Sequence, residues 1–185
     1  MTALTRLHDR TLGVLARVLE GWFLPTAARF AFAAVLLMYF WKAAVTKLGD
    51  GVFGFLAPNG NAYYQVFPKA TEAAGFDPAG LSTFHWLVVT AGTMAEFVLP
   101  ALIILGLLTR LAALGMIGFV IVQSYVDVNG HGISGADLGG WFDASSGSLV
   151  MDQRLMWGLL FMVLVVQGAG PISLDRLFTR AGAKA

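Results

Sequence analysis

The sequence contains no cysteine, and few of its residues carry a charge. The missing cysteines exclude disulfides, thiolate nucleophiles, cysteine-bound zinc and iron–sulfur clusters within this chain. Charged residues make up 12% of the chain, against about 25% in soluble domains. Hydrophobic residues make up 57%, and the mean hydropathy is +0.73. The composition therefore indicates an integral membrane protein, for which the first partner is the lipid bilayer.

Motifs of several other function classes are also missing. The sequence has no GxGxxG or GxxxxGK[ST] loop, so nucleotide binding has no support. The net charge of +1 gives no indication of nucleic-acid binding. Residues 1–10 are too charged for the apolar region of a signal peptide, and we expect them to remain on the mature protein. The chain of 185 residues fits one domain.

Four apolar segments are long enough to cross a bilayer as helices. A helix of about 20 residues spans the hydrocarbon core, which is roughly 30 Å thick. The expected spans are about 25–47, 84–108, 111–128 and 151–167, and glycine and proline at 168–171 end the last one. We therefore predict an all-α fold, a four-transmembrane-helix bundle over residues 24–178 with a tail at 179–185.

Residues 1–23 are predicted to form an amphipathic helix, because their leucines recur at helical spacing among arginines. Two placements are open for this helix. It lies in the membrane interface with its arginines at anionic headgroups, or it packs across the cytoplasmic ends of the bundle. The loop at 48–83 is rich in phenylalanine and tyrosine, which favours a lid at the opposite, outer interface.

The flanks of the spans differ in their content of lysine and arginine. One set of flanks holds Arg6, Arg10, Arg17, Arg29, Arg110, Arg176, Arg180 and Lys184. The other set holds Lys47 and Lys69, with Arg154 at the start of the last span. Basic residues stay on the cytoplasmic side. Both termini should therefore be cytoplasmic, in a bacterial-type inner membrane.

Three polar residues lie at a similar depth on three of the expected spans. Helix rise places Glu96, Gln123 and Lys42 about 18–20 Å from the inner ends of their helices. Charged groups at such depth usually face the bundle interior and pair with one another. We expect a Lys42–Glu96 pair with Gln123 bonded to one of them. The alternative for Lys42 is that its long stem carries the amine to the outer interface.

A second polar group is expected at the outer membrane surface, where Lys47, His85, Asp127 and His131 map. Histidines with a carboxylate can ligate a metal, but these residues lack a diagnostic spacing, and no metal site is assigned. Haem ligation by His85 and His131 is no better supported. At the inner surface, Arg110 and Asp175 carry opposite charges beside the ends of two spans, which predicts a clamp between them.

Three segments of the chain together match the motifs of a known protein family. The first runs from Arg29 to Lys47-Leu48, with Ala44 where the family pattern has glycine. The second runs from Glu96 to Ala113 and contains GLLTR, with Leu99 and Pro100 in place of the usual glycines. The third is GAGPISLD at residues 168–175. Together these segments resemble the DoxX family of small four-helix membrane proteins, and the resemblance covers about residues 29–178.

The resemblance implies a link to redox work, because some members belong to thiosulfate:quinone oxidoreductase as its DoxD subunit. One hypothesis is a subunit of a quinone-linked membrane oxidoreductase, with Glu96 as the catalytic residue and the other polar residues around a quinone. Without cysteine, such a chain needs a redox partner subunit or a bound cofactor. The second hypothesis is a non-catalytic anchor or assembly subunit of a redox or metal-handling complex. A proton or solute conduit ranks third, because four helices enclose little room unless they form a homo-oligomer.

Overall fold

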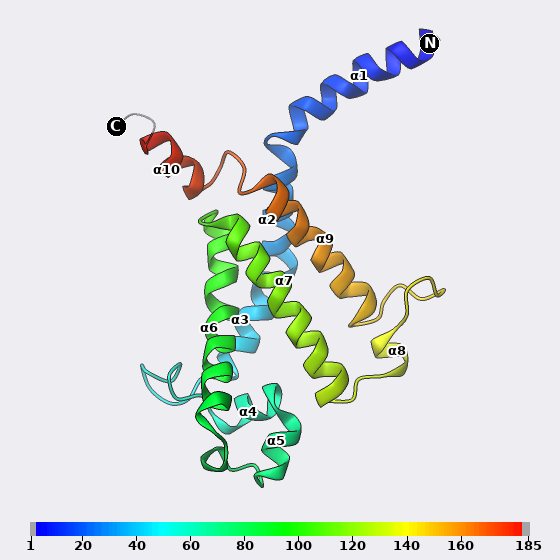
Figure 1. The fold of residues 1–185 in the computed structure, drawn as a ribbon. Helices are drawn as coiled ribbons and strands as arrows, with labels where there is room; N and C mark the ends of the chain where they lie inside the picture. The colour runs from blue at the N-terminus through cyan, green and yellow to red at the C-terminus, as the bar shows by residue number, and fades with distance from the viewer. Residues whose placement is uncertain (1–2, 183–185) are drawn as a thin grey trace.

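The computed structural model describes residues 3–182, which form helices joined by turns and loops and include no strand (Figure 1). The α-helices are α1 (Ala3–Glu20), α2 (Phe23–Phe32), α3 (Met38–Val45), α4 (Gly60–Val66), α5 (Pro68–Ala73), α6 (Thr83–Leu105), α7 (Thr109–Tyr125), α8 (Gly135–Leu138), α9 (Met151–Gln167) and α10 (Leu174–Gly182). The tighter or wider turns are η1 (Ala33–Leu37), η2 (Pro78–Gly80) and η3 (Val126–Gly130). Lys184, counted above with the basic flank, lies outside the described residues.

Three of the helical segments are long and apolar enough to cross a membrane. They are Phe23–Val45, in which the π-helical turn η1 joins α2 to α3, together with Thr83–Leu105 and Thr109–Gly130. The expected fourth span coincides with α9, which has 17 residues. At 1.5 Å per residue this gives a length of about 25 Å, slightly less than the hydrocarbon core. The described chain is thus a helical membrane protein with three spans of full length.

The long helices pack side by side around an apolar interior. Phe32, Leu36 and Phe40 follow one another at four-residue spacing along the first span, and each is at most 1% exposed. The ring of Phe32 lies 5.9 Å from that of Phe161 on α9. Helix α9 packs along α7 and α2, and α6 contacts α3 and α7. Their four-residue spacing therefore places these side chains on one helix face, which forms part of the core.

Helices α6 and α7 are joined by a tight turn that ends the second span earlier than expected. Gly106 and Leu108 both have left-handed backbone conformations, with φ of 66° and 48°. Any side chain at position 106 would collide with Ser173, because a Cβ added to Gly106 would lie only 2.5 Å from the Cβ of Ser173. Glycine is favoured here for two reasons, the positive φ and the close approach of another segment. From this turn, α6 and α7 diverge toward the opposite end of the molecule (Figure 1).

Arg29 holds the end of the molecule at which this turn lies. Its guanidinium donates to the carbonyl oxygens of Ile103 at 2.9 Å and Ala169 at 3.1 Å. It also donates to the carbonyl oxygens of Ile104 and Ile172. These acceptors belong to the last turn of α6 and to the segment between α9 and α10. One charged side chain therefore joins the first span to both of the other chain segments that meet there.

Asp175 caps α7 at the same end and does not pair with Arg110. Its two carboxylate oxygens accept from the backbone N–H groups of Leu108 at 2.7 Å and Thr109 at 3.1 Å. Amides at a helix start have no partner within the helix and carry partial positive charge, so a carboxylate is favoured there. The guanidinium of Arg110 lies against Gly168. The expected Arg110–Asp175 clamp is wrong, although both residues do lie at this end.

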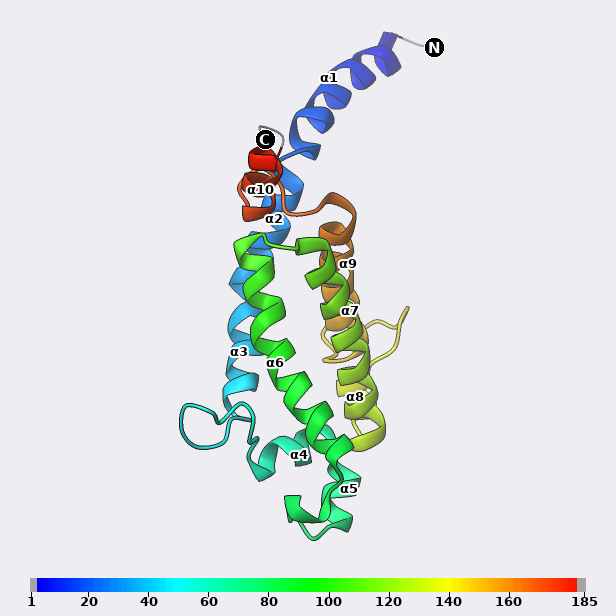
Figure 2. The same cartoon turned by 60° about the vertical axis from the view of Figure 1, so that its left-hand side comes forward.

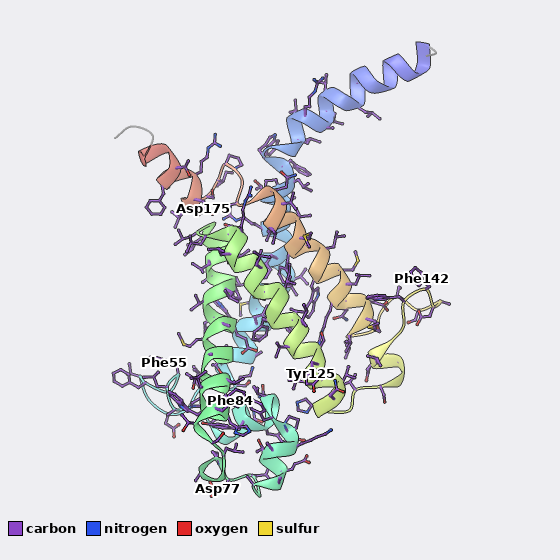
Figure 3. All side chains as sticks on the ribbon, in the orientation of Figure 1. Phe55, Asp77, Phe84, Tyr125, Phe142 and Asp175 are labelled. Atoms are coloured by element: carbon purple, nitrogen blue, oxygen red, sulfur yellow. The ribbon has the colours of Figure 1, made fainter. Side chains whose placement is uncertain are left out.

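The loop expected to form a lid is folded at the other end. Helices α4 and α5 lie there, beside the start of α6 and the end of α7 (Figures 1 and 2). Ala62 and Tyr63 of α4 pack on Val89 of α6 in a small apolar cluster. Asp77 marks this end in Figure 3, and Asp175 marks the end held by Arg29. The two ends of the molecule therefore differ. One end is held by hydrogen bonds from Arg29 to backbone carbonyls, and the other end is covered by the short helices α4 and α5.

The first and last helices extend away from the end held by Arg29 (Figures 1 and 2). On α1, Leu12, Leu15 and Val18 are exposed, and on α10 Leu177 and Phe178 are exposed. Helix α1 contacts α2, which follows it in the chain. The arrangement does not pack α1 across the helix ends, which was one of the two placements expected for residues 1–23.

We predict that Arg29→Met lowers the free energy of unfolding by about 2–4 kcal/mol, since hydrogen bonds from charged donors contribute about 1.5–3 kcal/mol each and do not add fully. The measurement is denaturant unfolding of the purified protein in detergent, followed by circular dichroism. Arg17→Met is the matched control, because the exposed Arg17 bonds the Gly13 carbonyl of its own helix and bonds no other element among the described residues. An equal loss in both variants would show that the contacts of Arg29 do not stabilise the fold.

Candidate functional site

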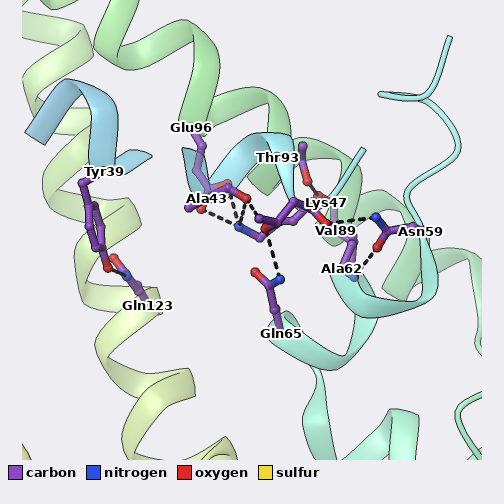
Figure 4. A network of polar contacts seen from close by, with 11 residues as sticks. Tyr39, Ala43, Lys47, Asn59, Ala62, Gln65, Val89, Thr93, Glu96 and Gln123 are labelled. Carbon is purple, nitrogen blue, oxygen red and sulfur yellow. Dashed lines mark hydrogen bonds and ion pairs between the residues drawn. The ribbon is translucent and has the colours of Figure 1, made fainter. Parts of the chain in front are cut away.

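Glu96 forms a buried ion pair with Lys47. The Lys47 Nζ lies 2.7 Å from one carboxylate oxygen of Glu96 and 2.9 Å from the other (Figure 4). It also donates to the Ala43 carbonyl oxygen at 3.1 Å. Lys47 is 6% exposed and Glu96 5% exposed. The ammonium group thus has three acceptors, and neither charge is left alone in the interior.

The helical faces explain why these two side chains meet. On α6, the buried residues Val89, Thr93, Glu96, Pro100 and Ile103 recur at intervals of three and four, so they form one inward face. On the first span, Phe40 and Ala44 are buried at the same spacing, and Lys47 continues their face just beyond the helix. Glu96 therefore lies on the buried face of α6, and Lys47 lies on the buried face of the first span. The two side chains meet because these faces pack against each other.

Lys42 is exposed, and the expected Lys42–Glu96 pair is wrong. Lys42 lies two residues from Phe40 and Ala44, which places it on the opposite side of the helix. The distance of a residue along its helix gives its depth in the membrane but not the direction in which its side chain points. The repeated spacing of Phe32, Leu36, Phe40 and Ala44 was the signal that favours Lys47.

Polar residues of the lid support the end of the first span next to the ion pair. The side-chain amide of Asn59 donates to the carbonyl oxygens of Thr46 and Leu48, at 2.9 Å each. Its side-chain oxygen accepts from the Ala62 amide and caps α4. The Gln65 amide donates to the Thr46 hydroxyl at 3.2 Å. Asn59 and Gln65 are absent from the expected site residues, although Asn59 before Gly60 is a typical helix N-cap.

A cavity of about 540 Å³ lies between α3, α6 and α7 beneath α4, and Glu96 and Lys47 are in its wall. Small residues line much of the rest, among them Ala91, Gly92 and Gly118. A Cβ added at Gly92 or Gly118 meets nothing within 4 Å. Cavities of this size hold small organic ligands. Its walls are mostly apolar, with a few polar groups at one place.

The cavity opens sideways between α6 and α7. Of its lining residues, Leu87 and Ala91 on α6 and Gly118 and Val122 on α7 are also exposed on the outside of the molecule. These residues lie within two of the spans, so the opening faces the lipid. Toward the turn at Gly106 the helices close, because a side chain at Gly115 would press on Leu99 at 3.1 Å.

Gln123 lines the same cavity, and its side-chain amide is only partly hydrogen-bonded. Its side-chain nitrogen donates to the Tyr39 hydroxyl at 2.8 Å (Figure 4). Its side-chain oxygen is buried and has no partner within the described residues. Turning the amide over leaves its nitrogen unpaired instead, so one polar atom lacks a partner in either orientation. Gln123 was expected beside Glu96 or Lys42, and it bonds Tyr39 instead.

Asp127 and His131 line the cavity near the lid, and His85 does not. Asp127 pairs with Arg154 of α9, which also donates to the Ser124 hydroxyl at 2.8 Å. The His131 ring lies 3.0 Å from the Gln65 carbonyl oxygen. His85 bonds Ser82 at the start of α6 and meets the ring of Phe67 edge-on. The two histidines considered as haem ligands therefore do not share this cavity.

We predict that Lys47→Met destabilises the protein by about 3–5 kcal/mol, because it leaves the Glu96 carboxylate buried without its counter-charge. Lys42→Met, a change of the same type on the exposed face, should have little effect. The double variant Lys47→Met/Glu96→Gln should recover most of the loss, since it removes both charges. Unfolding in detergent measures all three variants. A larger loss from Lys42→Met than from Lys47→Met would contradict the pairing.

Comparison with known proteins identifies the family. The model of the DoxX family matches residues 24–126, which include α2, α3, the lid, α6 and α7 and so most of the cavity wall. The search of curated proteins found no match, and the search of solved structures found none either. The match covers more than half of the chain. The chain belongs to the DoxX family.

Proposed function

We propose that this chain is the membrane subunit of a quinone-linked redox system and that the cavity between α6 and α7 binds the quinone. The observation that carries the proposal is an apolar cavity that opens to the lipid and has buried polar groups in one part of its wall. A quinone has the matching form, a ring with two carbonyl oxygens and an apolar tail, and it travels in the bilayer. Membership of a membrane family associated with redox functions supports this proposal.

The residues present fit such a ligand. The side-chain oxygen of Gln123 has no partner within the described residues, and a rotation of this side chain toward the cavity would let it accept a hydrogen bond from a hydroxyl group, which the reduced form of a quinone carries. Lys47 and Glu96 offer a donor and a proton acceptor in the same wall. A quinone supplies two-electron, two-proton chemistry between its carbonyl and hydroxyl forms. The role proposed for Glu96 is to hold a proton close to the ligand, and Lys47 stabilises its charged form.

Electrons for this chemistry must reach the cavity from elsewhere. The chain has no cysteine, so it cannot take electrons from sulfur compounds by its own thiol chemistry. We therefore propose a redox partner subunit. A chain that binds no quinone would instead be a non-catalytic anchor or assembly subunit, with Glu96–Lys47 as a structural pair.

We infer that α9 is a fourth span and that the end held by Arg29 is cytoplasmic. Helix α9 runs antiparallel to α7 (Figure 1). The segment 131–150 between them is longer than a tight turn between neighbouring helices. The described basic residues Arg17, Arg110 and Arg176 all lie toward the end held by Arg29, which the distribution of basic residues assigns to the cytoplasm. The lid formed by α4 and α5 then faces the outside.

Reporter fusions test this topology. A fusion at Gly75, in the lid, and one at Ser145, before α9, should report the outside of the cell, and a fusion after Lys184 should report the cytoplasm. Alkaline phosphatase and green fluorescent protein are suitable reporters, because each is active on one side only. A C-terminal fusion active outside would reverse the orientation, or would remove α9 from the spans if the loop fusions kept their sides.

For the ligand, we predict that Gly118→Leu weakens binding of a short-chain ubiquinone or menaquinone by about tenfold or more, because filling a site with extra methylenes costs about 1–3 kcal/mol. Binding is measured by titration of the protein in lipid nanodiscs, together with extraction of co-purified quinone. Gly158→Leu on α9 is the matched control, since a Cβ there also meets nothing and Gly158 does not line the cavity. Both changes favour the helix equally.

Two outcomes separate the proposed functions. Failure of the wild-type protein to bind either quinone would reject the quinone site and favour the anchor. If quinone binds, the folded double variant Lys47→Met/Glu96→Gln should bind it but lose turnover with the partner system, because the site then has no titrating carboxylate. Full turnover in that variant would show that Glu96 is structural.

A further inference from the structure

The cavity that has the buried Glu96 in its wall extends to residues at the surface beside the lid. His131 is exposed, Asp127 is half-buried, and both line the cavity that contains Glu96. The titratable side chains in its wall are Tyr39, Lys47, Glu96, Asp127 and His131. Arg154 reaches Asp127 from α9. The helical elements that line the cavity, α3, α4, α6, α7 and η3, or the residues next to them, therefore each contribute at least one polar residue to its wall.

Short contacts lead from His131 to Lys47 and Glu96 by way of Gln65 and the exposed Thr46, which lies beside the cavity wall. The His131 ring contacts the Gln65 backbone oxygen, and the Gln65 side chain donates to the Thr46 hydroxyl. That hydroxyl donates at 2.7 Å to the Ala43 carbonyl oxygen, which also accepts from Lys47. Lys47 in turn contacts Glu96, as Figure 4 shows. A cavity of about 540 Å³ with such groups in its wall has room and partners for several water molecules.

In the other direction the interior is apolar. Leu99 presses on α7 at Gly115 and closes the cavity. Beyond this contact, Ile103, Ala112 and Ala113 are each at most 1% exposed. At the end of this apolar region the Arg29 guanidinium already has carbonyl partners. The sideways opening faces lipid, which supplies neither water nor ions.

We propose that water and protons reach Glu96 from one side of the membrane only, the side on which α4 and α5 lie. His131 stands at the entrance of this path. The inference does not depend on a quinone, because it concerns the access of water to an ionisable group within the membrane. Access from one side has a consequence for proton transfer. Any proton that Glu96 takes up or releases comes from, or goes to, the aqueous phase on the side of the membrane where α4 and α5 lie.

The natural absence of cysteine makes the test direct, because any introduced thiol is the only one in the chain. Ala95→Cys places a small thiol in the cavity wall beside Glu96, and Gln123→Cys is a second position in the same wall. The exposed Ser145 and Arg176, changed to cysteine, report the two sides of the membrane. The reagents are charged, membrane-impermeant methanethiosulfonates, applied to sealed vesicles from outside or loaded inside.

The thiol of Ala95→Cys should react whenever the reagent is on the side at which Ser145→Cys reacts, and should not react when it is on the side at which Arg176→Cys reacts. Adding His131→Trp should slow the reaction several-fold by narrowing the entrance. Ser134→Trp, a nearby exposed position outside the cavity wall, should leave the rate unchanged. Reaction at 95 or 123 from the Arg176 side, or no reaction at both positions from the Ser145 side, would overturn the proposal. Quinone plays no part in this assay, so its failure and that of the proposed function are distinguishable.

Discussion

The fold depends on how Arg29 binds backbone carbonyls. A helix of membrane length can satisfy all of its backbone groups except those at its ends. The last carbonyls of α6 and those after α9 meet at one place, and the guanidinium of Arg29 binds both sets. A cation is also favoured at this position by the partial negative charge at a helix C-terminus. One residue of the first span therefore fixes where the other two segments end, and Asp175 does the same for the start of α7.

The cavity at the other end is a consequence of this arrangement. Helices α6 and α7 are held together at the turn and by the contact of Leu99 with Gly115, and from there they diverge. The space between them is covered by α4 and contains the Glu96–Lys47 pair. Buried ion pairs are weak contributors to stability, since desolvation offsets much of their attraction. The presence of such a pair in a cavity wall is therefore better explained by use of the site than by stability alone.

Much of the fold could be predicted from the sequence, because membrane spans are specified by local composition. The three full-length spans begin and end within a few residues of their expected limits, and the aromatic loop does lie over one end of the helices. The errors concern the directions of side chains. Lys42 and Lys47 lie five residues apart, and only the rotation of the helix distinguishes the buried one. Likewise, Arg110 and Asp175 have opposite charges at one end of the molecule, but the Asp175 carboxylate accepts hydrogen bonds from backbone amides. A prediction from side-chain charges alone leaves such backbone partners out.

The contacts of Arg29 have a consequence for reading sequences of this type. All four of its acceptors are main-chain oxygens, contributed by Ile103, Ile104, Ala169 and Ile172. Any amino acid at these positions presents the same oxygen, so their side chains are free to vary without weakening the contact. Statistical methods that infer contacts from correlated substitutions would therefore find no partner for Arg29, even though it joins segments 74 and 140 residues away along the chain.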